Sequence, residues 1–495
     1  MLTHALSLLS LLCVAVCTAS NADDDALTLV QVIHRHGART PIVYSNISLI
    51  CPTGCGMLNW EGKQMLVAQG KYLRQRYNGS ALFPSAWYNP RVVTSRSTNI
   101  LRTLQSAAGL LQGLFPNMTD YFPAISTVYL FTDTLLLVDA IPAFHIFQQL
   151  HFQDTATSII EPHLRLVFNK SIVETIGLEL SIDTMCFNTS FFVQCIMEAQ
   201  DIAASYASTG VLSNGSFPVT LAFRPQLNEA LHLLNSLQYP YNASSSEDRA
   251  RGSLGQNVVT AMLQNMHAKD KGQLPQTLMH YSAHDTTVMP FAATLGNNDL
   301  MLPLFGTMYV LELWRSAATN LSTVRAYAAI PGQTPGVHDP AIESFPLHCI
   351  AANGTVYAVP AYPGSCPIDD FERFVNSSKP QSAAGQCYLS SDDFAQIGGN
   401  TVGSDQVPDP SSLLSFYRQR CPDQACPTGA FLNANLSCST PLTEVDGNSI
   451  TSPNAVIVGV ASGLGGILLG VVIVKLAPVF WTGTKQEHYS PVNSP

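Results

Sequence analysis

The stretch LTLVQVIHRHGARTP, residues 27–41, is an apolar run that ends in two histidines, two arginines and a glycine. An apolar run of this kind is typical of a buried β-strand. The cationic end stands out, because the chain has a formal net charge of −10 and only 12% charged residues. An anion bound by this protein must therefore be held by a local cluster of cations, and residues 34–41 are the first candidate.

Strand and helix patterns alternate around this stretch. Strand-like runs are followed by helical periodicity at three places: 27–35 then 60–77, 91–95 then 96–115, and 276–283 then 284–296, with a further strand at 305–314. This alternation predicts an α/β fold whose loops gather at the carboxyl edge of the sheet. We expect a three-layer α/β/α sheet domain. We also expect a smaller domain inserted at about 132–230, where the apolar residues have mostly helical spacing.

The two ends of the chain predict where in the cell the protein is located. Residues 1–22 have an apolar core followed by small residues, which is typical of a secretory signal peptide. Residues 455–474 carry no charge, and at ~1.5 Å per residue they would span the ~30 Å of a bilayer core. We therefore predict a single C-terminal transmembrane helix, after a folded domain at 25–440 and a stalk at 441–454. Residues 475–495 would form a cytoplasmic tail, because Lys475 and Lys485 follow the span.

Glycosylation and cysteine patterns agree with a lumenal or extracellular body. Ten cysteines remain after the signal peptide and none lies in a paired zinc pattern, so we expect disulfides and no metal or other cofactor. The acidic balance also argues against nucleic acid as a partner. Sequons lie at Asn46, Asn78, Asn117, Asn169, Asn188, Asn214, Asn242, Asn320, Asn353, Asn376 and Asn435, all between the two apolar ends.

The cationic stretch has the residues needed for phosphoryl transfer. Arginine forks bind phosphate oxygens, and Arg35 and Arg39 flank a glycine that allows a sharp turn. A neutral imidazole at His36 could attack phosphorus and form a phosphohistidine. Two other predicted strand ends supply the remaining groups: Arg96 as a third cation, and the pair His284-Asp285 with a proton donor for the leaving alcohol.

These residues resemble the histidine acid phosphatases, a branch of the phosphoglycerate-mutase-like superfamily. The family motif R-H-G-x-R-x-P stands at residues 35–41, and YSAHDTT at 281–287 is similar to the signature of the prostatic and lysosomal enzymes. RSTNILRTLQSA, residues 96–107, resembles the stretch with the third phosphate-binding arginine. The resemblance implies hydrolysis of phosphate monoesters without metal. His36 would be the nucleophile and Asp285 the proton donor, with Arg35, Arg39, Arg96 and His284 binding the phosphoryl oxygens.

Other interpretations of the same residues remain open. His34 is a rival nucleophile, although a structural role at the strand end suits it better. A second His-Asp pair, His338-Asp339, has prolines on both sides and no strand before it, which indicates a loop. An inositol-polyphosphate phosphatase of the same superfamily would share the motifs. A non-catalytic type I receptor or adhesion protein on this fold is the third alternative.

The sequence also departs from the family pattern. Asn99 stands where relatives have an acidic residue, and Met308 stands at the usual partner position of Cys186, so Cys195 becomes the expected mate of Cys186. By proximity and by the family pattern we expect Cys51–Cys55 and Cys349–Cys366. Cys387 would pair with Cys421, Cys426 or Cys438. The secondary structure of residues 377–454 cannot be assigned from their composition.

The apolar span and the tail carry two weaker signals. Glycines 459, 463, 466 and 470 lie along one helix face, which would allow a homodimer within the membrane. Tyr489-Ser490-Pro491-Val492 resembles the sorting signal of lysosomal membrane proteins, which a cytoplasmic adaptor would read as an extended segment. We therefore expect an endosomal or lysosomal location, or the cell surface, with the catalytic domain on the lumenal or outer side.

Overall fold

A computed structural model describes residues 25–43, 46–78, 87–117, 122–188, 191–399, 412–426 and 429–439. The predicted signal peptide, stalk, apolar span and tail all lie outside these residues, and so do the dimerisation glycines and the sorting signal. Within the described ranges, no helix is both long and apolar enough to cross a membrane.

The body of the protein is built on a mixed sheet in the order β10-β6-β5-β1-β4-β2-β3, with β7 added beside β6. β1, β4, β2 and β3 are mutually parallel, whereas β5 pairs antiparallel with β1. The carboxyl ends of the parallel strands therefore meet at one edge. The strands are β1 (Asp25–Arg35), β2 (Val93–Ser97), β3 (Ile125–Ser126), β4 (Leu278–Ala283), β5 (Met308–Ser316), β6 (Ser322–Ile330), β7 (Ala341–Ser344) and β10 (Cys366–Pro367).

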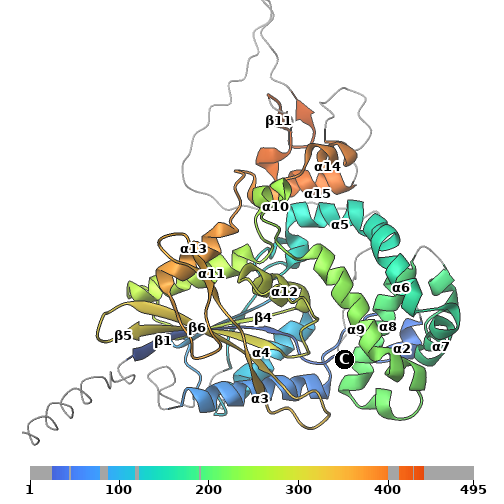
Figure 1. Cartoon of the computed structure of the whole chain (residues 1–495), viewed down its shortest axis with the longest axis horizontal. Coiled ribbons are helices and arrows are strands. Elements are labelled where there is room, and N and C mark those ends of the chain that lie inside the picture. The colour runs from blue at the N-terminus through green and yellow to red at the C-terminus, as the bar shows by residue number, and fades with distance from the viewer. Residues whose placement is uncertain are drawn as a thin grey trace, which may run out of the picture.

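Helices cover both faces of this sheet, as the apolar run at its centre predicts. Leu29 and Ile33 of β1 belong to one hydrophobic core, whereas Val30 and Val32 belong to the core on the opposite face. Helices α3 and α4 lie below the sheet in Figure 1, and α11, α12 and α13 lie above it. Their bounds are α3 (Trp60–Arg76), α4 (Leu101–Leu114), α11 (Gln256–Asp270), α12 (Asp285–Thr294) and α13 (Ile368–Ser377).

A helical region lies beside the sheet and has its own hydrophobic core. The sequence pattern places this region at about 132–230, and the helices observed here run from Pro142 to Arg251. α8 is its most buried helix, with Phe192, Ile196 and Ile202 fully covered. The helices are α5 (Pro142–Thr155), the π-helix η3 (Ala156–Ile160), α6 (Glu161–Val167), α7 (Lys170–Leu180), α8 (Phe192–Ser208), α9 (Pro218–Gln238) and α10 (Ser246–Arg251).

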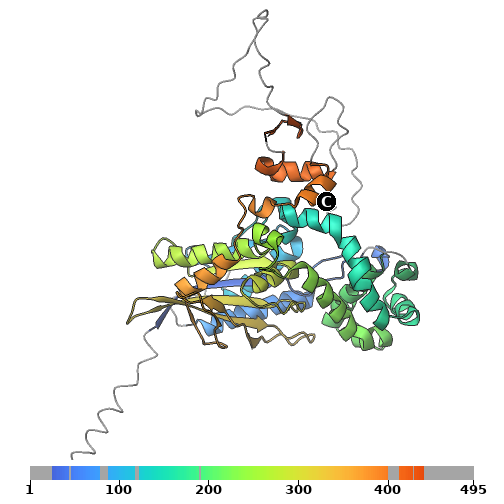
Figure 2. The same ribbon diagram turned by 45° about the horizontal axis from the view of Figure 1, so that its top comes forward.

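The segment without a sequence-based assignment forms short elements that pack on α5 (Figure 2). Leu414 and Tyr417 of this segment share a small core with Ile146 of α5. The elements are α14 (Ser391–Gln396), α15 (Ser412–Arg420) and the strand pair β11 (Phe431–Leu432) and β12 (Cys438–Ser439), with β8 (His348–Ile350) and β9 (Val356–Ala358) preceding them.

All ten cysteines of the described chain form disulfides, which agrees with the expectation from their even number. The pairs are Cys51–Cys55, Cys186–Cys195, Cys349–Cys366, Cys387–Cys421 and Cys426–Cys438. The three pairs expected from the sequence are confirmed, and Cys421 is the partner of Cys387 among the three alternatives. Two disulfides thus cross-link the C-terminal segment. Its elements need such cross-links because they are too short to bury a core alone.

One boundary differs from the sequence-based expectation, and the difference affects the site. The pattern predicts a strand at 91–95 and a helix from residue 96, whereas β2 runs to Ser97 and α4 begins at Leu101. Arg96 therefore lies inside a strand. Arg102, not Arg96, occupies the first turn of the helix that follows.

Candidate active site

The ends of β1 and β4 are tied together at the start of the R-H-G motif. The His36 amide donates to Ala283 O (2.9 Å), and the Gly306 amide donates to His36 O (3.0 Å). The next residue must be glycine, because a Cβ at Gly37 would lie 2.2 Å from Gly62 O of α3. The motif is thereby fixed between two strands and a helix, and His36 is held at the carboxyl edge of the sheet.

His36 has one ring nitrogen engaged in a way that defines its tautomer. Nδ1 lies 2.9 Å from Gly37 O, and because a carbonyl oxygen only accepts, Nδ1 carries the proton. Nε2 therefore holds a lone pair. The side chain is only 1% exposed. Burial, followed by the charges of Arg102, Arg35 and Arg39, lowers the pKa of His36 well below its usual value. His36 thus stays neutral, as a nucleophile requires.

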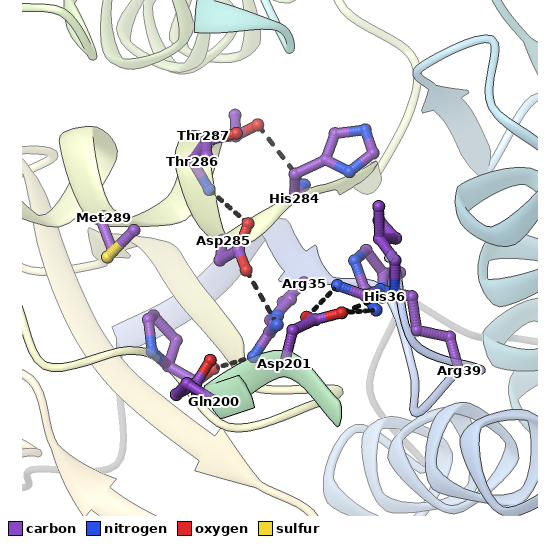
Figure 3. A network of polar contacts seen from close by, with 12 residues as sticks. Arg35, His36, Arg39, Gln200, Asp201, His284, Asp285, Thr286, Thr287 and Met289 are labelled. Atoms are coloured by element: carbon purple, nitrogen blue, oxygen red, sulfur yellow. Dashed lines mark hydrogen bonds and ion pairs between the residues drawn. The ribbon is translucent and has the colours of Figure 1, made fainter. Parts of the chain in front are cut away.

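Arg35 connects the motif to the predicted proton donor. Its Nη2 forms an ion pair with Asp285 Oδ2 (2.8 Å), and its Nη1 donates to Pro303 O (2.6 Å). The guanidinium also stacks 4.3 Å from the ring centre of Phe305, which lies beside His36 as well. Asp285 begins α12, where the amide of Thr286 donates to its Oδ1 (2.9 Å). Figure 3 shows Asp285 directed at Arg35 beside His36.

Arg39 is held by a residue that the sequence analysis missed. Its two terminal nitrogens bind the two oxygens of Asp201 at 2.9 and 2.7 Å, in the bidentate fork typical of arginine and carboxylate. Asp201 Oδ2 also accepts from the backbone amide of Ile42 (2.7 Å), so one carboxylate fixes both the side chain and the backbone of the motif. Asp201 comes from α8, which brings the helical region to the edge of the sheet (Figure 3).

Arg102 takes the place that the sequence analysis gave to Arg96. Its Nη2 donates to His284 Nδ1 (3.2 Å), and its charge acts on both His36 and His284. Burial, followed by the charge of Arg39, lowers the pKa of Arg102 to about 9, so it remains a cation in neutral and acidic solution. Arg96 instead forms an ion pair with the buried Asp133 (2.6 Å) and does not join the group around His36. Arg96 thus lies apart from the cluster in this structure, and its role in phosphate binding stays a prediction.

Two arginines of the cluster have a buried nitrogen for which the described residues supply no acceptor. The Nε atoms of Arg35 and Arg39 are buried and lack a hydrogen-bond acceptor among the described residues. A buried N–H without a partner is costly, and an anion oxygen would supply the missing acceptor. The electrostatics agree, because three arginines converge on His36 whereas two carboxylates, Asp201 and Asp285, balance them.

His34 lies behind this cluster and has both ring nitrogens engaged. Nδ1 contacts Arg35 O (2.9 Å) and Nε2 contacts His280 Nε2 (2.8 Å), while His280 Nδ1 contacts Ser95 Oγ (2.8 Å). The carbonyl forces a proton onto His34 Nδ1, so His280 donates to His34 and accepts from the serine hydroxyl. His34 thus has no lone pair available for attack. The structure supports its interpretation as a structural residue.

The second His-Asp pair lies in a loop, as its prolines predict. His338 contacts Glu61 Oε2 of α3 (2.7 Å) and Gly332 O (2.9 Å). These contacts fasten the loop to the first turn of α3, and His338 is not among the groups that act on His36.

Comparisons with known proteins identify the family of this chain and several similar enzymes. Residues 42–328 match the sequence profile of the family described as Histidine phosphatase superfamily (branch 2). The chain is 26% identical over 384 residues to lysosomal acid phosphatase of Rattus norvegicus, covering 74% of this chain and 81% of that protein. It is also 26% identical over 390 residues to the prostatic acid phosphatase of the same species, covering 75% and 91% of the two chains.

A solved structure supports the fold. The phytase from Klebsiella sp. ASR1 superposes with a TM-score of 0.53 at 19% identity, over 74% of this chain and all of that one. At this identity the likeness bears on the fold alone. The family match covers more than half of the chain and includes α4, α8 and α12, which carry Arg102, Asp201 and Asp285. The chain belongs to the histidine phosphatase superfamily, branch 2.

Proposed function

We propose that this protein is an acid phosphomonoesterase that hydrolyses phosphate esters through a phosphohistidine at His36. The observation that carries the proposal is a neutral, buried imidazole with Nε2 as its lone-pair nitrogen, inside a cluster of Arg35, Arg39 and Arg102. A cationic enclosure around a neutral nucleophile suits attack on a phosphate dianion, because the arginines attract the substrate and stabilise charge in the transition state.

In the first step, Nε2 of His36 attacks phosphorus while the bond to the ester oxygen breaks. The leaving oxygen takes a proton from Asp285, whose side chain is 22% exposed and therefore accessible at the edge of the site. A phosphate dianion competes with Asp285 for Arg35, so substrate binding weakens the ion pair that holds Asp285 as a carboxylate. In the second step, water attacks the phosphohistidine and returns its proton to Asp285, which releases inorganic phosphate.

We also propose that the reaction needs no metal, since the three arginines supply the positive charge that a metal ion supplies in other phosphoryl transfers. The test is hydrolysis of p-nitrophenyl phosphate and an alkyl phosphate from pH 4 to pH 8, with and without a chelator. We expect turnover that is highest in acid, because Asp285 must be protonated, and that the chelator leaves unchanged. Inositol hexakisphosphate belongs in the same panel, since a strong preference for it would favour the inositol-polyphosphate alternative. Absence of hydrolysis of every ester would contradict the proposal.

The proposed location is the lumen of endosomes or lysosomes, or the outer side of the cell membrane. The disulfides suit an oxidising compartment, and a lysosomal acid phosphatase is among the similar proteins. The apolar span at 455–474 would anchor the protein, and Tyr489 would be read by a sorting adaptor. Tyr489→Ala should increase the surface fraction measured by biotinylation while the specific activity stays constant. A surface fraction that does not change would remove the sorting role.

A further inference from the structure

The loop before β5 lies against the start of the R-H-G motif. Pro303 O accepts from Arg35 Nη1 (2.6 Å), and Thr307 O accepts from the backbone amide of Arg35 (2.9 Å). These two contacts hold the loop in place beside the motif. Phe305 lies between them in the sequence and is only 4% exposed. The reaction steps proposed above give this buried aromatic residue no role.

The ring of Phe305 faces two guanidinium groups at once. The Cζ atom of Arg35 lies over the ring, 4.3 Å from its centre, and the Cζ atom of Arg39 lies 5.8 Å from the same centre. Both distances fall within the ~6 Å over which an aromatic face attracts a cation. The centre of the His36 ring lies 5.9 Å away. One buried ring therefore adjoins both arginines of the motif and the proposed nucleophile.

Phe305 interacts with these arginines in a different way from the carboxylates. Asp285 and Asp201 bind the terminal nitrogens of the two guanidinium groups, and each brings a negative charge that repels a phosphate. A phenyl ring attracts a cation through the electron density of its face, and it carries no net charge. An anion can still supply the acceptor that the buried Nε atoms of both arginines lack among the described residues.

We propose that Phe305 is a positioning residue, whose ring holds the guanidinium groups of Arg35 and Arg39 in place for a phosphate through cation–π attraction. This inference rests on the proposed function, in which both arginines stabilise the phosphoryl group. Burial lowers the pKa of Arg35, Asp285 opposes this shift, and the charge of Arg39 adds to it, because the two cations repel each other. A ring that attracts both cations offsets part of this repulsion before the phosphate arrives, without adding a negative charge.

The test varies the electron density of the ring at nearly constant shape. Phenylalanine with one, two or three ring fluorines is introduced at position 305 of the full-length protein by stop-codon suppression. Each fluorine weakens the attraction of the ring face for a cation, while the ring stays apolar. The probe is inorganic phosphate, measured by calorimetry and as an inhibitor of p-nitrophenyl phosphate hydrolysis. We expect its inhibition constant to rise with each fluorine and to reach about tenfold with three.

Conventional variants and a second phenylalanine provide the controls. Phe305→Leu removes the ring and should raise the phosphate inhibition constant by about tenfold, whereas Phe305→Tyr keeps it and should stay within about threefold of the wild type. Phe115 is buried against Tyr88 just beyond the last residue of α4, whereas Arg102 lies in the first turn of that helix. The same fluorines at Phe115 should leave the constant unchanged, because this ring lies far from the cluster.

The fluorine series separates positioning from packing, because a ring that only fills space would not respond to its own electron density. A phosphate inhibition constant that stays level along the series would overturn the inference and leave the proposed function intact. An equal rise with fluorines at Phe115 would overturn it as well. The series remains decisive if Phe305→Leu fails to fold, since the fluorinated rings keep the shape of the wild-type side chain. A wild-type protein that neither binds phosphate nor hydrolyses esters would contradict the proposed function, and the inference with it.

Discussion

The strands β1 and β4 each contain one histidine and are each followed by a second one, and the two resulting pairs behave differently. His34 and His280 lie within the strands, stack on each other and use all four ring nitrogens in a chain that ends at Ser95. His36 and His284 lie just beyond the strand ends, and their rings meet edge to face beside the arginines. All four have pKa values lowered by burial. Burial alone therefore does not distinguish a catalytic histidine. What distinguishes His36, the proposed nucleophile, is that its Nε2 holds a lone pair and that three arginines act on the ring.

The largest expected effect is on the pair beyond the strand ends, His36 and His284, which we call the outer pair. His36→Ala removes the nucleophile and should lower kcat for p-nitrophenyl phosphate by on the order of 10⁴-fold or more. The fold should survive, because among the described residues the ring's hydrogen bond is a local one to Gly37 O. Circular dichroism and the unfolding midpoint are the controls. A variant that keeps even a few per cent of wild-type activity would show that the outer pair does not contain the nucleophile.

The next effect concerns Arg102 and Arg96, because the sequence alone does not show which of the two lies beside His36. Arg102→Ala should reduce kcat/KM by on the order of 10²–10³-fold, because it removes a cation that acts directly on His36. Arg96→Lys keeps a cation beside Asp133 and should change kcat/KM by less than about threefold. The two variants are compared in the same steady-state assay. The opposite ranking would restore Arg96 to the site.

A smaller effect is expected at the pair within the strands, His34 and His280, which we call the inner pair. This effect is on the stability of the protein and not on catalysis. His280→Leu leaves His34 Nε2 and the Ser95 hydroxyl buried without their partner, which should cost about 2–4 kcal/mol of the free energy of unfolding. The turnover number of the folded fraction should stay within about twofold of the wild type, since His280 does not contact the cluster. Denaturant unfolding followed by fluorescence measures the first quantity. A large loss of turnover with unchanged stability would give the inner pair a catalytic role.

The inner pair also predicts a pH dependence of stability. Burial lowers the pKa of His34 from 6.5 to about 4, despite the hydrogen bond to Arg35 O, which raises it. Between these values the unfolded chain binds a proton that the folded chain does not, so the free energy of unfolding falls as the pH falls from 6.5 towards 4. The full loss is at most about 3 kcal/mol and is complete below the folded-state pKa. Replacing both His34 and His280 by Gln should flatten this slope in pH-dependent unfolding, and an unchanged slope would place the titration elsewhere.

Much of the fold and part of the site follow from local sequence. The apolar run before His36 predicts a central strand, and the runs before Arg96 and His284 predict its neighbours, because strand periodicity and turn residues are local signals. Parallel strands share a carboxyl edge, so His36 and Asp285 could be placed together without coordinates. The inner pair shows the limit: the sequence identifies His34 as structural but does not indicate that His280 is its partner.

Two residues of the site lay beyond sequence reasoning for different reasons. Arg102 was missed because a strand boundary was misplaced by two residues, which moved the strand-to-helix junction onto Arg96. Asp201 was missed because it is 162 residues from Arg39 and lies in a helix with no motif. Its one local signal is polar side chains on the buried surface of α8, where Glu198, Gln200 and Asp201 are all covered. Such burial is visible only once the helical region has been placed against the sheet.

The most direct test of the difference between the two histidine pairs is to trap the phosphoenzyme. Asp285→Asn, given an aryl phosphate labelled with ³²P and quenched in alkali, should accumulate a phosphoryl group that is stable in base and labile in acid. Peptide mapping should place the label on His36. A label on His34, His280 or a carboxylate, or no covalent label under conditions of active turnover, would contradict the assignment of His36 as the nucleophile.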